Sequence, residues 1–407
     1  MITDSTLSAD AGVTYPDGYL AAAVRCGLKT EGDDLAVIVS DRPATAAGVF
    51  TTNQVKASCV LHSREIARAG SARAIVCNAG NANACNGARG DRDTKRMAEC
   101  AAQALGVAPD RVLVASTGVI GHPLPMERVE PAIARAASAV RRGPEIDQAV
   151  VRAIMTTDTR PKLLAAEFRS DAWPGPLRIG AVCKGSGMIA PNMATMLCFL
   201  TTDAQVEPAL LQQALTSAVR RTFNRVTVDS DTSTNDMCLA LANGAGPVRI
   251  EARGPAADDL AEALRIVCER LARQIARDGE GATKLVEVEV RGAACEQDAD
   301  RIARTIAESP LVKTALFGND PNWGRIVAAA GRAGVPFDPE TLRVELCGIE
   351  VFRNGAGVEF DAQAARAALQ REETSVVVDL GAGGGAAKYW TCDFSYDYVR
   401  INADYHT

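Results

Sequence analysis

The sequence predicts an α/β or α+β protein, and two observations lead to this fold class. Short apolar segments rich in Val and Ile alternate along the chain with longer segments that have the hydrophobic spacing of helices. Such alternation is typical of proteins that pack helices on sheets. The 407 residues are also about two to three times the ~150 residues that one domain usually takes. We therefore expect more than one packed unit.

The strand-like segments of the first part are short and continuously apolar, as strands buried on both faces of a sheet are. They cover residues 35–39, 74–77, 111–115 and 179–183, with a further strand at 196–200. The clearest helix spans residues 257–277, where Leu260, Leu264 and Val267 recur at helical spacing and Gly279 follows as a cap. Other helices are expected at residues 94–105, 129–142, 145–155, 208–221 and 299–308.

The character of the chain changes beyond residue 281. Residues 286–290 alternate Val with Glu, which is the pattern of a half-exposed strand, and residues 343–352 and 375–380 are further strand candidates. A domain boundary is therefore expected there, between a larger region, residues 1–280, and a smaller region, residues 281–407.

The glycine-rich segment 381–388 is similar to a phosphate-binding loop only at first sight. Ala386 replaces the second glycine of such a loop, and Tyr389 stands where a Ser or Thr would bind magnesium. The segment also lies too close to the end of the chain for a nucleotide-binding fold to follow it. We expect a turn between two strands.

The charge balance argues against several classes of partner. The chain has 44 basic and 50 acidic residues, a formal net charge of −6, and no basic cluster that would bind nucleic acid. No segment approaches the ~18 consecutive apolar residues of a membrane span. The first 18 residues contain acidic but no basic side chains, unlike a secretory signal. The expected location is the cytoplasm.

Cysteine and histidine are distributed in a way that disfavours metal and histidine chemistry. The 12 cysteines are scattered without a C-x-x-C pair, and several lie in apolar runs, so we expect buried thiols. Only His62, His122 and His406 occur, far apart in the sequence. Zinc enzymes and Ser-His-Asp enzymes need imidazoles as ligands or bases. No metal is expected, and an enzyme of this sequence would use another base.

Two polar segments follow predicted buried strands, where sites of α/β proteins tend to lie. Residues 78–87 contain four Asn and two Gly, which suits either an elaborate turn or the polar wall of a cleft. Residues 116–121 contain Thr117 and Gly118. The hydroxyl of Thr117 and a backbone N–H presented at Gly118 are candidates for an oxyanion hole.

Residues 184–195 form the most unusual segment, since two Gly and a Pro interrupt an otherwise apolar run that ends at Thr195. A threonine at a chain terminus can act as a nucleophile without histidine, because its own α-amine, with a pKa near ~8, serves as the base. That chemistry requires a break before Thr195, which an N-to-O acyl shift in a constrained loop can produce. From these residues alone, Thr195 is either such a nucleophile or an ordinary residue at the start of a strand.

The sequence of this segment closely resembles the self-cleavage segment of the ornithine acetyltransferases, also called glutamate N-acetyltransferases, of arginine biosynthesis. The match covers residues 184–197 and 201–204. Other similar stretches follow in the same order along nearly the whole chain: residues 48–53, 78–87, 116–121, 156–162, 229–236, 278–284, 318–325 and 402–405.

The resemblance implies a fold of stacked sheets between helix layers, like the autoprocessing aminopeptidases and amidases, with a smaller C-terminal α/β domain. It implies a cut between Ala194 and Thr195, giving an alpha fragment, residues 1–194, and a beta fragment, residues 195–407. These fragments would stay associated as a heterotetramer of two alpha and two beta fragments, and the tail of the second domain would return to the active site.

Site residues also follow from the resemblance, position by position. It makes Thr195 the nucleophile, and Thr117 and Gly118 the oxyanion hole. The substrate-binding residues that it implies are Thr156, Lys184, Thr195, Glu280, Asn402 and Thr407. The repeated Thr156 and Thr157 leave a one-residue ambiguity. Ala79 and Asn86 depart from the Ser and Thr expected at their positions, which touches no catalytic residue.

The implied activity is acetyl transfer from N2-acetylornithine to glutamate by a ping-pong mechanism through an acetyl-threonyl enzyme, without a cofactor. The sequence leaves open whether acetyl-CoA is a second donor. Two other classes also remain open. An autoprocessing aminopeptidase or amidase would hydrolyse its substrate, and a binding protein of this fold would keep its chain intact.

Overall fold

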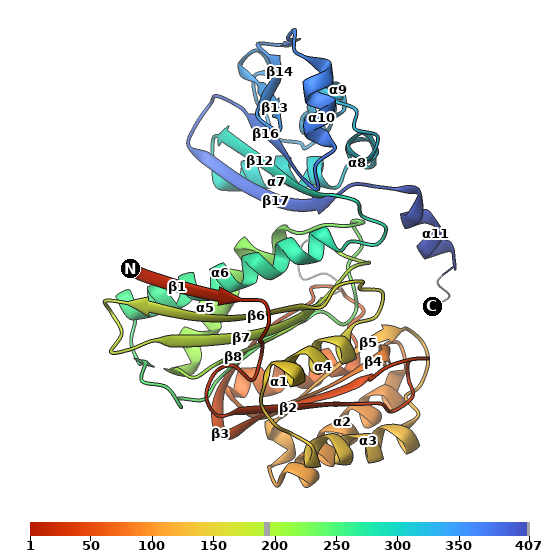
Figure 1. Cartoon of the computed structure of the whole chain (residues 1–407), viewed down its shortest axis with the longest axis vertical. Coiled ribbons are helices and arrows are strands. Elements are labelled where there is room, and N and C mark those ends of the chain that lie inside the picture. Colours follow the sequence, from red (N-terminus) through yellow and green to blue (C-terminus); the bar gives the residue numbers. More distant parts are fainter. Residues whose placement is uncertain (191–195, 405–407) are drawn as a thin grey trace.

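The computed structural model describes residues 1–190 and 196–404. Among these residues, nine strands form one large sheet (Figure 1). Eight follow the order β1 (Ile2–Ser8), β6 (Lys162–Ser170), β7 (Leu177–Lys184), β8 (Leu197–Thr202), β10 (Met237–Ala242), β3 (Leu35–Phe50), β4 (Ser71–Asn81) and β5 (Val112–Val119), and β2 (Tyr19–Val24) also pairs with β3.

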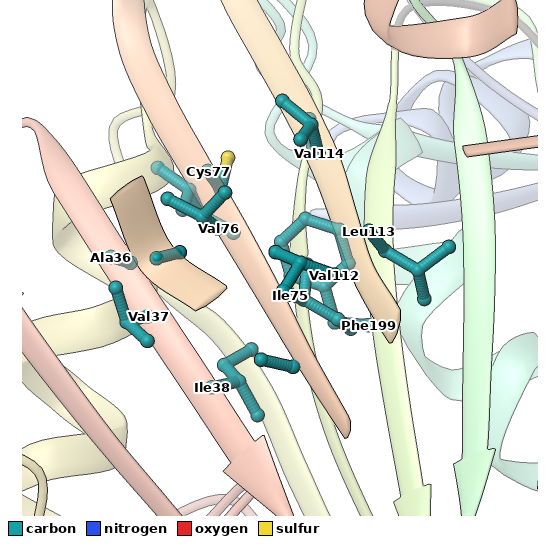
Figure 2. Packing of buried hydrophobic residues seen from close by; sticks show 14 of the residues in the cluster. Ala36, Val37, Ile38, Ile75, Val76, Cys77, Val112, Leu113, Val114 and Phe199 are labelled. Carbon is teal, nitrogen blue, oxygen red and sulfur yellow. The ribbon is translucent and has the colours of Figure 1, made fainter. Parts of the chain in front are cut away.

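The long strand β3 belongs to both halves of this sheet. The first half contains β2, β4 and β5, and the second half contains β1, β6, β7, β8 and β10. Residues 35–39 of β3 pair with β2 and β4, whereas its residues 45–50 pair with β10. Between them the register shifts, and the exposed residues 41–43 include a proline, which suits a bulge. The two halves stack, because Phe199 of β8 shares one apolar cluster with Ile75 of β4 and Val112 of β5 (Figure 2).

Helices cover the outer faces of the two halves (Figure 1). The helices α2 (Gly87–Leu105) and α3 (Met126–Ser138) lie on the first half, and α5 (Pro208–Arg221) and α6 (Pro255–Arg277) lie on the second half. Helix α1 (Ser58–Ala69) packs on β3 and β5, and α4 (Pro144–Ile154) contacts strands of both halves. The expected architecture, stacked sheets between helix layers, is confirmed.

The later part of the chain forms a second, six-stranded sheet with its own apolar core. Its strands are β15 (Ala356–Gly357), β14 (Ile349–Arg353), β13 (Arg343–Leu346), β16 (Glu373–Asp379), β12 (Leu285–Ala293) and β17 (Gly385–Cys392). The helices of this part are α7 (Glu296–Ala307), α8 (Pro310–Phe317), α9 (Trp323–Gly331) and α10 (Ala362–Leu369). A last helix, α11 (Tyr396–Asp404), extends from β17 (Figure 1).

The prediction of a single strand at residues 343–352 is wrong. Residues 343–352 form the hairpin of β13 and β14, because Cys347 and Gly348 take positive φ values of 51° and 82° and reverse the chain. In the glycine-rich segment 381–388, residues 381–384 form the expected turn, with Gly381 at φ 67°, and residues 385–388 already belong to β17.

The remaining elements are short. A two-stranded sheet joins β9 (Gln205–Val206) to β11 (Arg249–Ile250), and 3-10 turns occupy Pro109–Arg111, Phe223–Arg225 and Pro339–Thr341. None of the helices in the described parts of the chain combines the length and apolar character needed to cross a bilayer.

A buried acid–lysine cluster of Asp158, Lys162 and Asp278 ties three elements together. The Lys162 Nζ donates to Asp158 Oδ1 at 2.7 Å and also to Asp278 Oδ2, and all three side chains are almost fully buried. Asp278 ends α6 and also accepts the N–H and hydroxyl of Thr159. The cluster therefore fixes the start of β6 and the loop before it against the end of α6.

Asp158 stays ionised because of its partners. Burial alone would raise its pKa, but the positive charges of Lys162 and Lys184 and the hydrogen bonds from Lys162 and Gly185 outweigh burial and lower the pKa to about 2. A carboxyl with a lowered pKa in the folded state stabilises the protein above its unfolded pKa, near ~3.9. That contribution is lost as the pH falls from about 4 to about 2.

Replacing Asp158 tests this cluster. Asp158→Asn should lower the free energy of unfolding by about 3 kcal/mol at pH 7, because one partner of a buried ion pair is removed. The difference from the wild type should shrink as the pH falls from about 4 to about 2. Urea unfolding at pH 7, 4 and 3 measures both effects.

Asp41→Asn is the matched control, because Asp41 pairs with Arg42 on the surface and exposed ion pairs contribute little. Its unfolding midpoint should equal that of the wild type. A wild-type advantage over Asp158→Asn that stays constant with pH would contradict the ionised state of Asp158.

Candidate active site

Thr117 and Gly118 lie near the end of β5, where the strand runs parallel to β4. Gly118 has a φ of 128° and faces Gly80 so closely that a Cβ at position 118 would lie 2.3 Å from the Gly80 carbonyl carbon. Only glycine fits this contact and this conformation. The close approach fixes the backbone direction of the residues expected to form an oxyanion hole.

Lys184 ends β7 and reaches this segment. Its side chain is buried, and Nζ donates to Thr117 Oγ1 at 3.3 Å. In the antiparallel pairing of β7 with β8, Lys184 is opposite Leu197. The sheet therefore places Lys184 between Thr117 and the strand that follows Thr195 in sequence.

The segment after Lys184 is held from two sides. The Gly185 N–H donates to Asp158 Oδ1 at 2.7 Å, and the Ser186 carbonyl accepts from the Glu280 N–H at 2.9 Å. A Cβ at Gly187 would lie 2.2 Å from the Glu280 carboxyl carbon. Glycine at position 187 thus allows the Glu280 side chain to lie against the chain here.

The loop before β6 reaches the same segment. The Thr157 hydroxyl lies 3.2 Å from the Ser186 hydroxyl, while the Thr156 N–H donates to Asp158 Oδ2. Thr157 therefore uses its side chain to hold Ser186, and Thr156 is held through its backbone.

Glu280 is buried and connects the end of α6 to the tail of the chain. The Asn402 side-chain amide in α11 donates to Glu280 Oε2 at 2.9 Å. This bond joins residues 122 positions apart in sequence. The tail therefore returns to the residues around Lys184, although α11 buries none of its side chains.

Asp229 holds the chain upstream of the expected cut. Its carboxylate accepts the N–H groups of Met188 and Ile189 at 2.6 and 2.8 Å. Burial raises the pKa of Asp229 to about 6, against the opposing effect of these hydrogen bonds. Met188 takes a positive φ of 56°, so the carboxylate stabilises an uncommon turn.

A buried polar segment, residues 233–236, holds the chain downstream of the expected cut. Asp236 Oδ1 accepts the Met196 N–H at 3.0 Å. The neighbouring Asn235 donates from its side-chain amide to the carbonyls of Ser116 and Ala82 at 2.8 and 2.7 Å. The same segment thus orients the peptide that precedes Thr117 and the residue that follows Thr195.

The structure therefore brings together most of the site residues expected from the sequence. Thr117, Gly118 and Lys184 form one group, and Lys184 leads along the chain to a second group of Thr156, Glu280 and Asn402. Ala194, Thr195 and Thr407 lie outside the described residues.

The asparagine-rich segment 78–87 is mostly bonded to itself and its neighbours. The Asn78 amide donates to the Asn81 carbonyl, the Asn83 amide to the Gly90 carbonyl, and the Asn86 amide to Asn83 Oδ1. These bonds favour the interpretation as an elaborate turn, which supports Ser116 through a 2.7 Å bond to Asn78.

The His62 side chain has contacts outside this group of residues. The His62 ring is bonded to the Val112 carbonyl, and burial lowers its pKa. It lines a cavity of about 720 Å³ between α1 and α2, which contains none of the expected site residues. Within residues 1–190 and 196–404, no group of His, Cys, Asp and Glu side chains has the arrangement of a metal site.

Sequence reasoning missed the buried side chains that hold this site: Asp158, Asp229, Asn235 and Asp236. A signal was present, because residues 229–236 are eight consecutive polar residues directly before the apolar strand 237–242. All four side chains form hydrogen bonds with backbone groups of segments that contain expected site residues.

Known proteins similar to this chain match it over nearly its whole length. Residues 20–407 match the ArgJ family. A relative from a Synechococcus species, called arginine biosynthesis bifunctional protein ArgJ, is 52% identical in an alignment of 408 positions that covers 97% of each chain. The protein of the same name from Thermosynechococcus vestitus is 49% identical in an alignment of 415 positions that covers 97% of this chain and 98% of the relative.

A solved structure of the arginine biosynthesis bifunctional protein ArgJ from Bacillus halodurans is 46% identical, covers 51% of this chain and 98% of its own, and has a TM-score of 0.49. The similarity extends over nearly the whole chain in the curated relatives. The chain therefore belongs to the ArgJ family, the family of ornithine acetyltransferases that its motifs resemble.

Proposed function

We propose that this chain is an acetyltransferase of arginine biosynthesis that moves an acetyl group from N2-acetylornithine to glutamate through an acetyl ester on Thr195. Membership of the ArgJ family supports the reaction class. The single structural observation that carries the proposal is the position of Lys184. Its Nζ contacts Thr117 Oγ1, and its backbone pairs with Leu197, two residues after Thr195.

The nucleophile forms by self-cleavage. The Thr195 Oγ attacks the carbonyl carbon of Ala194, the peptide nitrogen leaves as the α-amine of Thr195, and an ester joins the two residues. Water then hydrolyses the ester, giving a carboxylate on Ala194 and a free amine on Thr195. Buried carboxylates hold both sides of this segment, through Met188 and Ile189 upstream and Met196 downstream.

Acetyl transfer reuses the same groups. Thr195 Oγ attacks the acetamide carbonyl of N2-acetylornithine, and the Thr195 amine takes the Oγ proton. The Thr117 hydroxyl and the Gly118 N–H stabilise the oxyanion. The C–N bond breaks, the ornithine nitrogen takes the proton back, and the acetyl ester remains on Thr195. The glutamate amine then attacks this ester by the reverse sequence, so the reaction consumes no water.

The expected substrate-binding residues recognise the charged groups of the substrate. Lys184 provides a positive charge for the substrate α-carboxylate, and Glu280 provides a negative charge for the ornithine side-chain ammonium. Thr156 adds a hydroxyl, and the tail residues Asn402 and Thr407 close the site. The bond from Asn402 to Glu280 supports this role of the tail.

The proposal extends to processing and assembly. Residues 1–280 carry the chemistry, residues 281–407 form a second domain, and the fragments 1–194 and 195–407 remain folded together. Two copies of each fragment form a heterotetramer in the cytoplasm. Acetyl-CoA is a second donor in this proposal, in keeping with the word bifunctional in the names of the relatives.

Replacing the nucleophile tests the core of the proposal. Thr195→Ala should remain one chain of 42.8 kDa and should form no N-acetylglutamate from either acetylornithine or acetyl-CoA. Intact mass and a product assay measure both outcomes. Free acetate in place of N-acetylglutamate from the wild type would instead indicate a hydrolase.

The oxyanion role of Thr117 predicts a loss of rate. Thr117→Val keeps the shape of the side chain but removes its donor, and kcat should fall about 100- to 1,000-fold, as for other oxyanion-hole donors. Thr117→Ser restores the hydroxyl and should restore most of the rate. Equal activity of the Val and Ser variants would rule out a donor role of this hydroxyl.

The role of Glu280 predicts a change in affinity for one substrate. Glu280→Gln keeps the size of the side chain and removes its charge. The KM for acetylornithine should rise about 10-fold or more, because a charged hydrogen bond contributes about 1.5–3 kcal/mol. The KM for acetyl-CoA, which lacks the ornithine ammonium, should change little. Unchanged kinetics with acetylornithine would show that Glu280 does not bind the side-chain ammonium of the substrate.

A further inference from the structure

The strand β5 lies at the end of the large sheet, where β4 pairs with one of its two sides. Side chains hold the other side, the outer edge of β5. There His62 Nε2 lies 3.0 Å from the Val112 carbonyl oxygen. The Ser63 hydroxyl is bonded to both the N–H and the carbonyl of Val114, at 2.8 and 2.7 Å. Every second residue of a strand turns its peptide groups to the same edge, so Ser116 is next on this side.

Asn235, in the segment before β10, holds the outer edge at Ser116. Its side-chain amide donates to the Ser116 carbonyl at 2.8 Å and to the Ala82 carbonyl at 2.7 Å, and Asn235 is only 4% exposed. Both acceptors are carbonyls, so only the NH2 side of the amide fits there. The amide oxygen accepts the Thr234 hydroxyl at 2.6 Å. The amide therefore has one orientation, with its NH2 group directed at two carbonyls.

The backbone that carries Asn235 is also fixed. The Thr51 hydroxyl donates to the Ser233 carbonyl at 2.8 Å. The Ala57 N–H donates to the Thr234 carbonyl at 2.9 Å, and the Asn235 N–H donates to Ser233 Oγ at 3.1 Å. The side chain of Asn235 therefore extends from a rigid turn rather than from a free loop.

The bond to Ser116 acts directly on the residues of the expected oxyanion hole. The Ser116 carbonyl and the Thr117 N–H lie in one rigid peptide plane, so the amide of Asn235 fixes where Thr117 begins. From that plane only the φ and ψ angles of Thr117 lead to the peptide that carries the Gly118 N–H. The alternation along β5 turns this N–H to the outer edge. The close contact of Gly118 with Gly80 fixes the chain from the other end.

We propose that Asn235 is a positioning residue for the oxyanion hole. Its amide fixes the peptide between Ser116 and Thr117, so that the Thr117 hydroxyl and the Gly118 N–H converge on the substrate oxygen. This inference rests on the proposed function, in which these two groups stabilise the oxyanion. Asn235 itself touches no substrate atom and takes no proton. Oxyanion donors are effective because their positions are set before the reaction.

Replacing Asn235 should affect kcat and KM differently. The oxyanion exists only in the transition state, so a misplaced oxyanion hole lowers kcat and leaves substrate binding intact. In Asn235→Ala both donors are lost, and kcat should fall about 10- to 100-fold, as for a misplacement of about 1 Å. The KM for acetylornithine should stay that of the wild type. The measurements are the fraction of cut chain, the urea midpoint, kcat and KM of the full-length protein after self-cleavage.

Asn243→Ala is the matched control. Asn243 follows β10, whereas Asn235 precedes it. It is 6% exposed, and its amide also donates to a carbonyl, that of Asp17, at 2.9 Å. The control variant therefore loses a similarly buried asparagine at the opposite end of the same strand, and its kcat should equal that of the wild type. An equal loss of kcat in Asn243→Ala and Asn235→Ala would overturn the proposal.

A double-mutant cycle with Thr117→Val separates positioning from a general structural defect. If Asn235 acts through the oxyanion hole, Asn235→Ala should slow the Thr117→Val enzyme at most about 3-fold, because part of the hole is already lost. The same loss of kcat in both backgrounds would overturn the proposal, since the effects of independent defects multiply. A raised KM with an unchanged kcat would also overturn it.

Asn235→Asp is the second variant in case Asn235→Ala is not cut. It keeps the shape of the side chain but places an oxygen where the two carbonyls need an NH2 group, so its kcat should also be lowered with an unchanged KM. A wild-type kcat in Asn235→Asp would overturn the proposal. So would a failure of both Asn235 variants to be cut while Asn243→Ala is cut, because Asn235 would then serve folding.

The failure of this inference is distinguishable from the failure of the proposed function. If Thr195→Ala retains activity, or if Thr117→Val is as fast as the wild type, the proposed function fails. If Thr117→Val is slow and Asn235→Ala is as fast as the wild type, the inference about Asn235 alone fails.

Discussion

The buried acid–lysine cluster of Asp158, Lys162 and Asp278 is the interaction on which the arrangement of the site depends. Three charges without access to water are stable together only because each is paired. Asp158 also accepts the N–H groups of Thr156 and Gly185, and Asp278 ends the helix that leads to Glu280. The loop before β6, the end of β7 and the end of α6 thus share one rigid support, and each contributes an expected substrate-binding residue.

A second buried support joins the two stacked halves of the large sheet at the same place. The segment 233–236 leads into β10, which pairs with β8 on one side and with β3 on the other. From there, Asn235 reaches β5 in the first half and Asp236 reaches Met196 in the second half. The fold therefore brings the ends of strands from both halves together at the candidate site.

Much of the fold and the site could be predicted from the sequence, and the exceptions have physical causes. Helix α5 has the expected bounds, residues 208–221, because its apolar spacing and first-turn proline are local signals. The length of β3 was not predicted, since the polar bulge at residues 41–43 interrupts its apolar pattern. The residues of the site could be named because they lie in distinctive motifs. Asp158, Asn235 and Asp236 could not, since their roles arise from contacts with residues distant in sequence, such as the bond from Asn235 to the Ala82 carbonyl across 153 positions.

The measurement that tests the central claim most directly is the mass of the fragments after incubation with acetylornithine alone. The wild-type protein should consist of two fragments, of which residues 195–407 become heavier by one acetyl group. Peptide fragmentation should locate that group on Thr195, and addition of glutamate should remove it with formation of N-acetylglutamate. Acetyl transfer by an uncut chain, or an acetyl group at any other residue, would contradict the claim.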